Sequence, residues 1–204
     1  MFVLGIETTC DETSASVVED GKSVLSNVVA SQIKDHRPWM GVVPEIASRL
    51  HLKKIIPIID EALQKANKKI EDIDLIAVAN RPGLIGGLVV GVSVAKSISF
   101  MNNIPLIGVN HIEAHLYSPN LTSEIEFPHI GLLVSGGHTL IVKAISFTKY
   151  EILGTTIDDA AGEAFDKIAK HYNMGYPGGP AVEKLAREGE SDAFNFPISN
   201  LYKS

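Results

Sequence analysis

Residues 129–146 read HIGLLVSGGHTLIVKAIS, and the prediction of the fold starts from this stretch. Two apolar runs suited to strands flank a polar turn, Ser135-Gly-Gly-His-Thr139, and YEILGTT (150–156) follows as a third strand. The chain opens in the same way, because the apolar run FVLGIE (2–7) leads into the polar loop TTCDET (8–13). The repeat predicts two halves, each beginning with a hairpin that carries a polar tip.

The segments after each hairpin predict further strands and helices. Two strand-like runs, SASVVED and KSVLSNVVAS, surround a turn at Asp20-Gly21. Residues 44–69 have apolar side chains near helical spacing; Pro44 suits a first turn, and Pro57 should kink or divide the helix. Further strands are expected at 74–80 and 105–110, a loop at 81–87, and helices at 88–103, 111–118, 158–173 and 180–190.

Two hairpins facing one another across a cleft are how the actin-like ATPase fold holds nucleotide phosphates. We therefore predict an α/β fold of this two-lobed class, built from duplicated βββαβα units. The first lobe should span residues 1–118, and the second, spanning 119–204, should be incomplete because it stops after two helices.

Composition limits the possible classes of protein. The 204 residues are 45% hydrophobic and 21% charged, which excludes a disordered or fibrous chain. Eighteen basic and 24 acidic residues give a net charge of −6, and no basic stripe is visible, so a nucleic-acid substrate would need positive charge from a partner. A single cysteine, Cys10, excludes an internal disulfide and is expected to pack rather than react. The longest apolar run is interrupted by Lys96 and looks too short for a membrane span, which indicates a cytoplasmic protein without a membrane partner.

The segment His111-Ile-Glu-Ala-His115 carries the sharpest chemical signal. Side chains four residues apart share one face of a helix, so both imidazoles can bind one metal ion. Glu113 should point to another face, which disfavours a zinc-protease mechanism. The alternative is two unrelated histidines at helical spacing. Two histidines also form an incomplete site, since a catalytic metal usually has three protein ligands.

The turn Ser135-Gly136-Gly137-His138-Thr139 is a candidate anion site. Paired glycines allow the backbone to approach a phosphate and to direct its N–H groups toward it. The alternative is an ordinary hairpin turn whose glycines need a positive φ.

Two segments farther along the chain supply candidate contacts to a nucleotide. Asp158 or Asp159 can cap the helix that follows, whereas Asp166 lies deeper and could bind ribose hydroxyls. In Gly175–Pro180 a tight connection between helices explains the prolines, and Gly178 and Gly179 could form a flat surface for a base or ribose.

The first polar loop, Glu7–Thr13, has short hydroxyl and carboxylate side chains. They suit phosphate or magnesium binding or proton transfer, and the alternative is a plain polar hairpin loop. Arg37 and Trp39 lie in a polar loop before the first long helix, where they could form a mobile lid or a packing anchor.

Six ordered motifs resemble the TsaD family, formerly called glycoproteases. They are GIETTCDETSASVV (5–18), GVVPEIASRLH (41–51), HIEAH (111–115), LLVSGGHT (132–139), IDDAAGEAFDKIAK (157–170) and YPGGP (176–180). The resemblance covers essentially the whole chain. It implies the actin-like fold and transfer of a threonylcarbamoyl group from threonylcarbamoyl-adenylate to the adenosine beside the anticodon of tRNA.

The resemblance also implies roles for individual residues. His111 and His115 would ligate iron or zinc, and Asp11 and Glu12 would lie beside the reacting centre as catalytic residues. The adenylate would contact Val134, Ser135, Gly136, Gly137, His138, Asp166 and Gly179. TsaB-like and TsaE-like proteins would be partners on the way to tRNA, and uncovered apolar faces would make a homodimer possible.

The sequence departs from the family in two ways. The family continues for roughly another hundred residues, bringing an aspartate as third metal ligand, so we expect this chain to be inactive alone. Asn80-Arg81-Pro82-Gly83 replaces a glycine-proline-glycine loop. A non-catalytic TsaB-like scaffold and a small-molecule kinase of the same fold are the alternatives; the histidine pair argues against both.

Overall fold

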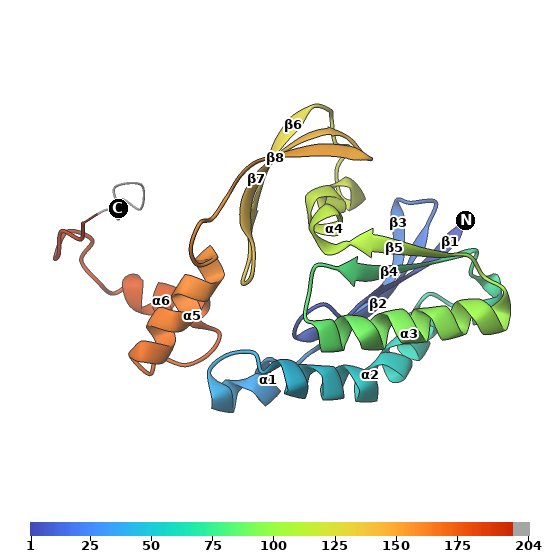
Figure 1. Cartoon of the computed structure of the whole chain (residues 1–204), viewed down its shortest axis with the longest axis horizontal. Helices are drawn as coiled ribbons and strands as arrows, with labels where there is room; N and C mark the ends of the chain where they lie inside the picture. Colours follow the sequence, from blue (N-terminus) through green and yellow to red (C-terminus); the bar gives the residue numbers. More distant parts are fainter. Residues whose placement is uncertain (198–204) are drawn as a thin grey trace.

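The computed structural model describes residues 1–197, arranged around two β-sheets (Figure 1). The larger sheet has the strand order β3-β2-β1-β4-β5, in which β1 pairs parallel with β4 and β4 parallel with β5. Its strands are β1 (Phe2–Glu7), β2 (Glu12–Glu19), β3 (Ser23–Ser31), β4 (Leu75–Arg81) and β5 (Leu106–Asn110). The smaller sheet has the antiparallel order β6-β7-β8, with β6 (His129–Val134), β7 (Thr139–Ser146) and β8 (Lys149–Thr155).

Two long helices cover one face of the larger sheet. They are α2 (Pro44–Lys65), which packs on β2 and β3, and α3 (Ile85–Asn102), which packs on β4. Buried side chains from these elements, among them Leu4, Ile55 and Ile76, form the main core. Figure 1 shows both helices on the same side of this sheet. The first half of the chain thus buries a conventional apolar core between helices and sheet.

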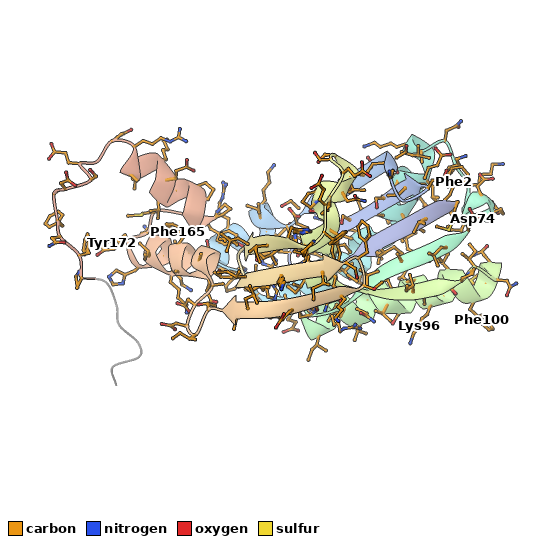
Figure 2. The ribbon with its side chains drawn as sticks, turned by 90° about the horizontal axis from the view of Figure 1, so that it is seen from above. Phe2, Asp74, Lys96, Phe100, Phe165 and Tyr172 are labelled. Atoms are coloured by element: carbon orange, nitrogen blue, oxygen red, sulfur yellow. The ribbon has the colours of Figure 1, made fainter. Side chains whose placement is uncertain are left out.

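The shorter helices lie between the sheets and at the far end of the molecule. Helix α4 (His111–Tyr117) connects β5 with β6 and packs against β7 through Ile112 and Leu116. Helices α5 (Ala161–His171) and α6 (Gly178–Ala186) pack on each other at the end opposite to Phe2 and Phe100 (Figure 2). Phe165 lies on α5, and Tyr172 directly follows this helix. The remaining helical segments are α1 (Ile33–His36) and 3-10 turns at Arg37–Trp39, Ile70–Asp72 and Ser118–Leu121.

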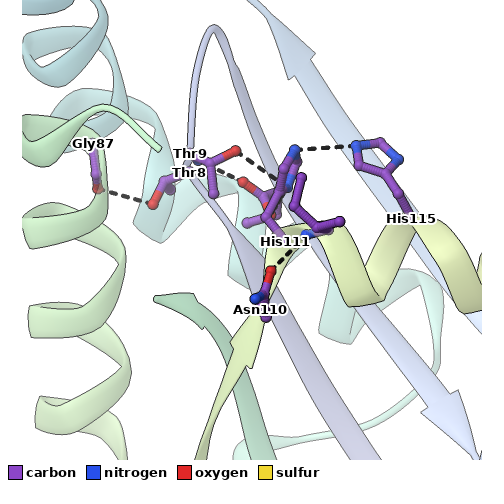
Figure 3. Close-up of polar contacts among 8 residues, drawn as sticks. Thr8, Thr9, Gly87, Asn110, His111 and His115 are labelled. Atoms are coloured by element: carbon purple, nitrogen blue, oxygen red, sulfur yellow. Dashed lines mark hydrogen bonds and ion pairs between the residues drawn. The ribbon is translucent and has the colours of Figure 1, made fainter. Parts of the chain in front are cut away.

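Helix α3 contacts the first polar loop through a row of small residues. A Cβ atom on Gly87 would lie 2.3 Å from the carbonyl oxygen of Thr8, and one on Gly91 would lie 2.2 Å from Thr8 Oγ1. The Thr8 hydroxyl donates to the carbonyl of Gly87 at 2.9 Å (Figure 3). The glycines are therefore required by close packing, which lets the helix support the loop directly.

Three expectations about local structure are wrong. Pro57 does not divide α2, which runs unbroken for 22 residues. Helix α3 begins at Ile85, inside the stretch expected to be a loop. By length and composition α3 could also cross a membrane, contrary to the expectation that its apolar run is too short. One face of α3 nevertheless packs on α2 and the sheet.

Candidate functional site

The two polar hairpin loops line one cleft. One end, here called the histidine end, has a volume of about 390 Å³ and is lined by residues that include Glu7, Glu12, His111, His115 and His138. The other, here called the glycine end, has a volume of about 700 Å³ and is lined by residues that include Gly162, Asp166, Tyr176 and Gly179. Both ends share Cys10, Asp11, Gly136 and Gly137, so they form one continuous space between the two sheets.

The parallel strands explain why distant residues meet at the histidine end. Strands β1 and β5 flank β4 and run in the same direction, so their carboxyl ends, at Glu7 and Asn110, lie at one edge of the sheet. The Asn110 side chain accepts a hydrogen bond from the Ile112 N–H at 2.8 Å, which caps α4 and fixes its start at His111 (Figure 3). Helix α4 therefore begins at the same edge of the sheet at which β1 ends with Glu7.

The two histidines of α4 face each other. Their Nε2 atoms are 3.1 Å apart, as expected for side chains one helical turn apart (Figure 3). Two nitrogen ligands on a metal with bonds of about 2.1 Å would lie about 3.0 Å apart at a right angle and about 3.4 Å apart at the tetrahedral angle. The pair thus fits two positions of one metal ion. Within residues 1–197 no group of three His, Cys, Asp or Glu side chains is placed to hold a metal.

Glu7 orients the first of these histidines. Its Oε2 atom lies 3.1 Å from His111 Nδ1, and Thr9 Oγ1 lies 3.3 Å from the same nitrogen. A carboxylate only accepts, so Nδ1 carries the proton and Nε2 keeps its lone pair for a metal. Burial opposes the charge on Glu7, but hydrogen bonds from His111 and Thr9 outweigh it and lower the pKa of Glu7. In the sequence Glu7 belongs to a polar loop, and no local pattern predicts its contact with His111.

The candidate catalytic acids lie next to the histidines. Asp11 lines both ends of the cleft, and Glu12 lines the histidine end. Desolvation, together with the charges of Asp11 and Glu7, raises the pKa of Glu12, which makes its carboxylate a stronger base. The Tyr176 hydroxyl lies 3.5 Å from Asp11 Oδ2 across the cleft. Burial and the charges of Asp11 and Asp166 raise the pKa of Tyr176 above its usual range.

Cys10 does not pack as expected. Its side chain is exposed in the cleft. Partial desolvation and the neighbouring Asp11 raise the pKa of the Cys10 thiol to about 12, which leaves little thiolate for reaction near neutral pH.

Neither the backbone conformation nor the packing of the Ser135–His138 turn requires its two glycines. The Ser135 N–H donates to the His138 carbonyl at 2.8 Å, which closes the turn. Neither Gly136 nor Gly137 has a positive φ, and a Cβ atom on either would meet nothing within 4 Å. The alternative of glycines required by turn conformation is therefore wrong, and the space in front of them is open to the cleft.

Two successive glycines follow the connection between α5 and α6, and packing requires only the first of them. A Cβ on Gly178 would lie 2.5 Å from the carbonyl oxygen of Phe165, so Gly178 is required by packing. A Cβ on Gly179 would meet nothing within 4 Å, and Gly179 lines the cleft. Asp166 also lines the cleft, while its Oδ1 atom accepts the Gly178 N–H at 2.7 Å and fixes the start of α6.

Several expected residues lie elsewhere. Val134 ends β6 with its side chain 56% exposed and outside the residues that line the cleft. Asp158 and Asp159 do not cap α5; Ala160 precedes that helix, and Thr139 Oγ1 accepts the Ala161 N–H at 2.9 Å instead. Arg81 is exposed and donates to Asn80 Oδ1 at 3.3 Å, so its cation does not line the cleft.

His138 and Trp39 are the remaining residues for which the sequence predicts a role. His138 lines the histidine end with its ring centroid 6.1 Å from that of His111, and desolvation together with His111 lowers its pKa. Trp39 is exposed rather than a packing anchor. The histidine end thus combines imidazoles with carboxylates, a set suited to acid–base and metal chemistry, beside an open wall of glycines.

Comparison with known proteins identifies similar sequences. Residues 23–203 match the family model described as TsaD, tRNA N6-adenosine threonylcarbamoyltransferase. A protein of that name from Brachyspira hyodysenteriae is 56% identical over 198 residues, which is 97% of this chain and 58% of the relative. One from Treponema denticola is 53% identical over 203 residues, which is all of this chain and 60% of the relative. The chain spans about 60% of the length of these relatives.

Solved structures establish the fold class alone. A ROK hexokinase from Thermus thermophilus has a TM-score of 0.53 at 16% identity, with 95% of this chain and 71% of the hexokinase covered. The ethanolamine utilization protein EutJ from Carboxydothermus hydrogenoformans has a TM-score of 0.50 at 15% identity, with 90% and 60% covered. The predicted α/β fold of the actin-like class is confirmed.

Proposed function

The chain belongs to the TsaD family, and we propose that it forms the cleft in which a threonylcarbamoyl group passes from threonylcarbamoyl-adenylate to the adenosine beside the anticodon of tRNA. One observation carries the proposal. Neither close packing nor a positive φ requires glycine at three positions that line the cleft, Gly136, Gly137 and Gly179. The space in front of them opens directly onto the histidines and carboxylates. The cleft volume is in the range of small-molecule sites.

The adenylate would lie along the cleft with its nucleotide at the glycine end. Gly136 and Gly137 have no side chain to obstruct a phosphate, and their N–H groups have no protein acceptor within residues 1–197. Asp166 is placed to accept from ribose hydroxyls while it holds α6, and Gly179 leaves room beside it. The threonylcarbamoyl group would then extend toward His138, His111 and His115.

The transfer is an acyl substitution. The exocyclic amine of the adenosine forms a bond to the carbamoyl carbon, the bond from that carbon to the phosphate oxygen breaks, and AMP leaves with the electron pair. The amine loses one proton, and Glu12 would accept it, because Glu12 lines the histidine end and desolvation raises the pKa of its carboxyl, which makes the carboxylate a stronger base. Asp11 lines the boundary between nucleotide and acyl group.

A divalent metal, iron or zinc, would be held by His111 and His115 and would supply charge stabilisation at the carbonyl when bound. The chain's own contribution is orientation: Glu7 fixes the tautomer of His111, and the Asn110 cap fixes the start of α4. A third ligand would come from outside residues 1–197.

The lobes, the partners, the location and the self-association of the protein are also proposals. We propose that residues 1–118 and 119–204 form two lobes; residues 198–204 lie outside the described part of the chain. The net charge of −6 supports tRNA binding through a complex, in which TsaB-like and TsaE-like proteins would be the partners. We further propose that the protein acts in the cytoplasm and that self-association is possible through its apolar faces. The identity to named transferases does not favour the scaffold or kinase alternatives.

Binding of AMP tests the nucleotide site. We expect AMP to shift the amide signals of Ser135–His138, Asp166 and Gly179, and Gly137→Val to abolish these shifts while the fold is retained, because valine would occupy the open space. Gly154→Val is the matched control, since a Cβ atom on Gly154 would also meet nothing within 4 Å but Gly154 does not line the cleft. The proposal fails if AMP leaves those signals unmoved in the unsubstituted protein.

Metal titration tests the histidine pair separately. Two ligands should bind Zn²⁺ or Fe²⁺ weakly, and His111→Ala should remove that binding. Tight binding by residues 1–204 alone would contradict the assignment of an external third ligand. The transfer itself is assayed with unmodified tRNA, threonine, bicarbonate, ATP and the partner proteins. We expect residues 1–204 to form little product, and a chain extended to the length of the relatives to form threonylcarbamoyladenosine.

A further inference from the structure

A chain of buried polar side chains lies behind the first polar loop. Thr13, Gln32, His36 and His51 are all fully buried, and none of them lines the cleft. They come from β2, the start of α1, the end of α1 and the buried face of α2. Each has hydrogen-bond partners, so the cost of burying polar groups is offset within the network.

The hydrogen bonds at His36 have a defined direction. The N–H of Val43 donates to His36 Nδ1 at 3.3 Å, so this nitrogen carries no proton. His36 Nε2 therefore carries the proton and donates to Gln32 Oε1 at 3.1 Å. Because Gln32 Oε1 accepts, its side-chain nitrogen is directed the other way, toward His51.

The same direction continues to the cleft loop. Gln32 Nε2 lies 3.4 Å from His51 Nδ1, and the Thr13 hydroxyl lies 2.8 Å from the same nitrogen. The Cys10 carbonyl beside Nε2 can only accept, so in the neutral ring Nε2 carries the proton and Nδ1 accepts, with the Thr13 hydroxyl as the nearer donor. His51 Nε2 then donates to the carbonyl of Cys10 at 2.9 Å. The main-chain N–H of Gln32 donates to the next carbonyl, that of Asp11, at 2.9 Å.

This assignment connects two walls of the cleft. At one end, Val43 follows Met40, Gly41 and Val42, which line the glycine end; at the other end are Cys10 and Asp11, which line both ends. The side-chain nitrogen of Gln32 also donates to the Ala47 carbonyl at 3.4 Å, which anchors the middle of the network on α2. A shift of either wall would break a buried hydrogen bond of this network.

We propose that the His36–Gln32–His51 chain positions Cys10–Asp11 and residues 40–43 for the ligand, with His51 as the positioning residue that holds the Cys10 carbonyl. This inference rests on the proposed function, in which the cleft binds an adenylate. His51 acts through the loop, since it does not line the cleft itself.

Two substitutions of His51 separate its two nitrogens. His51→Gln places an amide N–H near the position of Nε2 and can still donate to the Cys10 carbonyl. His51→Asn reaches only the position of Nδ1 and cannot. We expect His51→Gln to bind AMP within about threefold of the unsubstituted protein, and His51→Asn to lose about tenfold or more, with both variants folded by circular dichroism. If both bind like the unsubstituted protein, the proposal is overturned.

NMR of the imidazole rings tests the His36–Gln32–His51 hydrogen-bond chain in the absence of any ligand. Long-range nitrogen–proton spectra should show His36 and His51 as neutral rings protonated at Nε2, and His51→Asn should shift the amide signals of Asp11 and Glu12. A ring protonated at Nδ1 in His51 would overturn the proposed direction. If the unsubstituted protein does not bind AMP, the proposed function fails, whereas these NMR signals still test the proposed direction of the His36–Gln32–His51 hydrogen bonds.

A second pair of variants covers the case in which His51→Asn does not fold. Thr13→Val removes the hydroxyl that donates to His51 Nδ1 at nearly constant volume, and Thr13→Ser restores a hydroxyl. We expect Thr13→Val to weaken AMP binding and Thr13→Ser to recover it. Equal affinities for the two would overturn the proposal, since a purely steric role of Thr13 would favour valine over serine.

Discussion

The two sheets of the molecule bury their side chains very differently. Within residues 1–197, the larger sheet and its helices enclose a cluster of fifteen buried apolar residues, whereas β6–β8 share a cluster of five with α4. The other face of the smaller sheet exposes Ile130, Leu132, Val134 and Ile141. Since burial of apolar area is the main source of stability, the first region should carry most of the folding free energy. The second should contribute mainly the ligand-facing turn.

The largest difference between the regions should appear on truncating a buried side chain. Ile76 in β4 is fully buried, so Ile76→Ala should lower the free energy of unfolding by about 2–5 kcal/mol. The same change at Ile130, which is 61% exposed in β6, should stay within about 0.5 kcal/mol. Urea unfolding followed by circular dichroism measures both. Similar losses at the two positions would show that the open face of β6–β8 is covered in solution.

A single methyl group should distinguish the regions at their glycines. Gly87→Ala places a Cβ against the Thr8 carbonyl, so α3 or the loop must move, at a cost of about 1–3 kcal/mol. Gly154→Ala in β8 meets open space and should be neutral. Thermal unfolding of both variants provides the measurement, and an unaffected Gly87→Ala protein would mean that the loop is free to shift.

The first region should contribute to the pH dependence of stability, since every buried polar side chain found in residues 1–197 belongs to it. Desolvation lowers the pKa of His51 below its ordinary value of 6.5. The unfolded chain then binds a proton at a higher pH than the folded one, so stability should fall as the pH drops below about 6.5. Urea titrations between pH 8 and pH 5 should show this slope, reduced in His51→Gln. An unchanged slope in the variant would assign the effect to another group.

The smallest effect on stability is expected on the open face itself. Leu132→Ser replaces a side chain that is 67% exposed, so the free energy of unfolding should change by no more than about 0.5 kcal/mol. Binding of a hydrophobic dye should decrease because the apolar patch becomes smaller. A strongly destabilised variant would place Leu132 in a buried contact and remove the contrast between the two regions.

The sequence predicted features that depend on local pattern. Strand alternation located both hairpins, and the four-residue spacing of His111 and His115 placed both rings on one face of α4. The start of α3 was missed because Ile85-Gly-Gly looks like a loop, whereas those glycines are selected by the close approach of Thr8. Such tertiary packing overrides intrinsic helix propensity and leaves no local signal.

The residues behind the cleft were missed for a related reason. His51 lies between Ala47 and Ile55, four residues from each, on the buried side of α2. A histidine at that position of an apolar stripe was the available signal. Its partners Thr13 and Gln32 are polar residues with no distinctive spacing from it, so the network could not be predicted. The pairing of Glu7 with His111 likewise depends on the strand order, which the sequence analysis did not predict.

The contact between Tyr176 and Asp11 has a consequence for how the protein is assembled. It joins groups 165 positions apart in the sequence. Closing so long a loop costs more conformational entropy than forming a hairpin, and contacts of high sequence separation form slowly. The support of the Cys10–Asp11 loop by Gln32 and His51 needs only the first 51 residues. We therefore expect that, during synthesis, one wall of the cleft is set early and the complete cleft exists only after nearly all the described residues have left the ribosome.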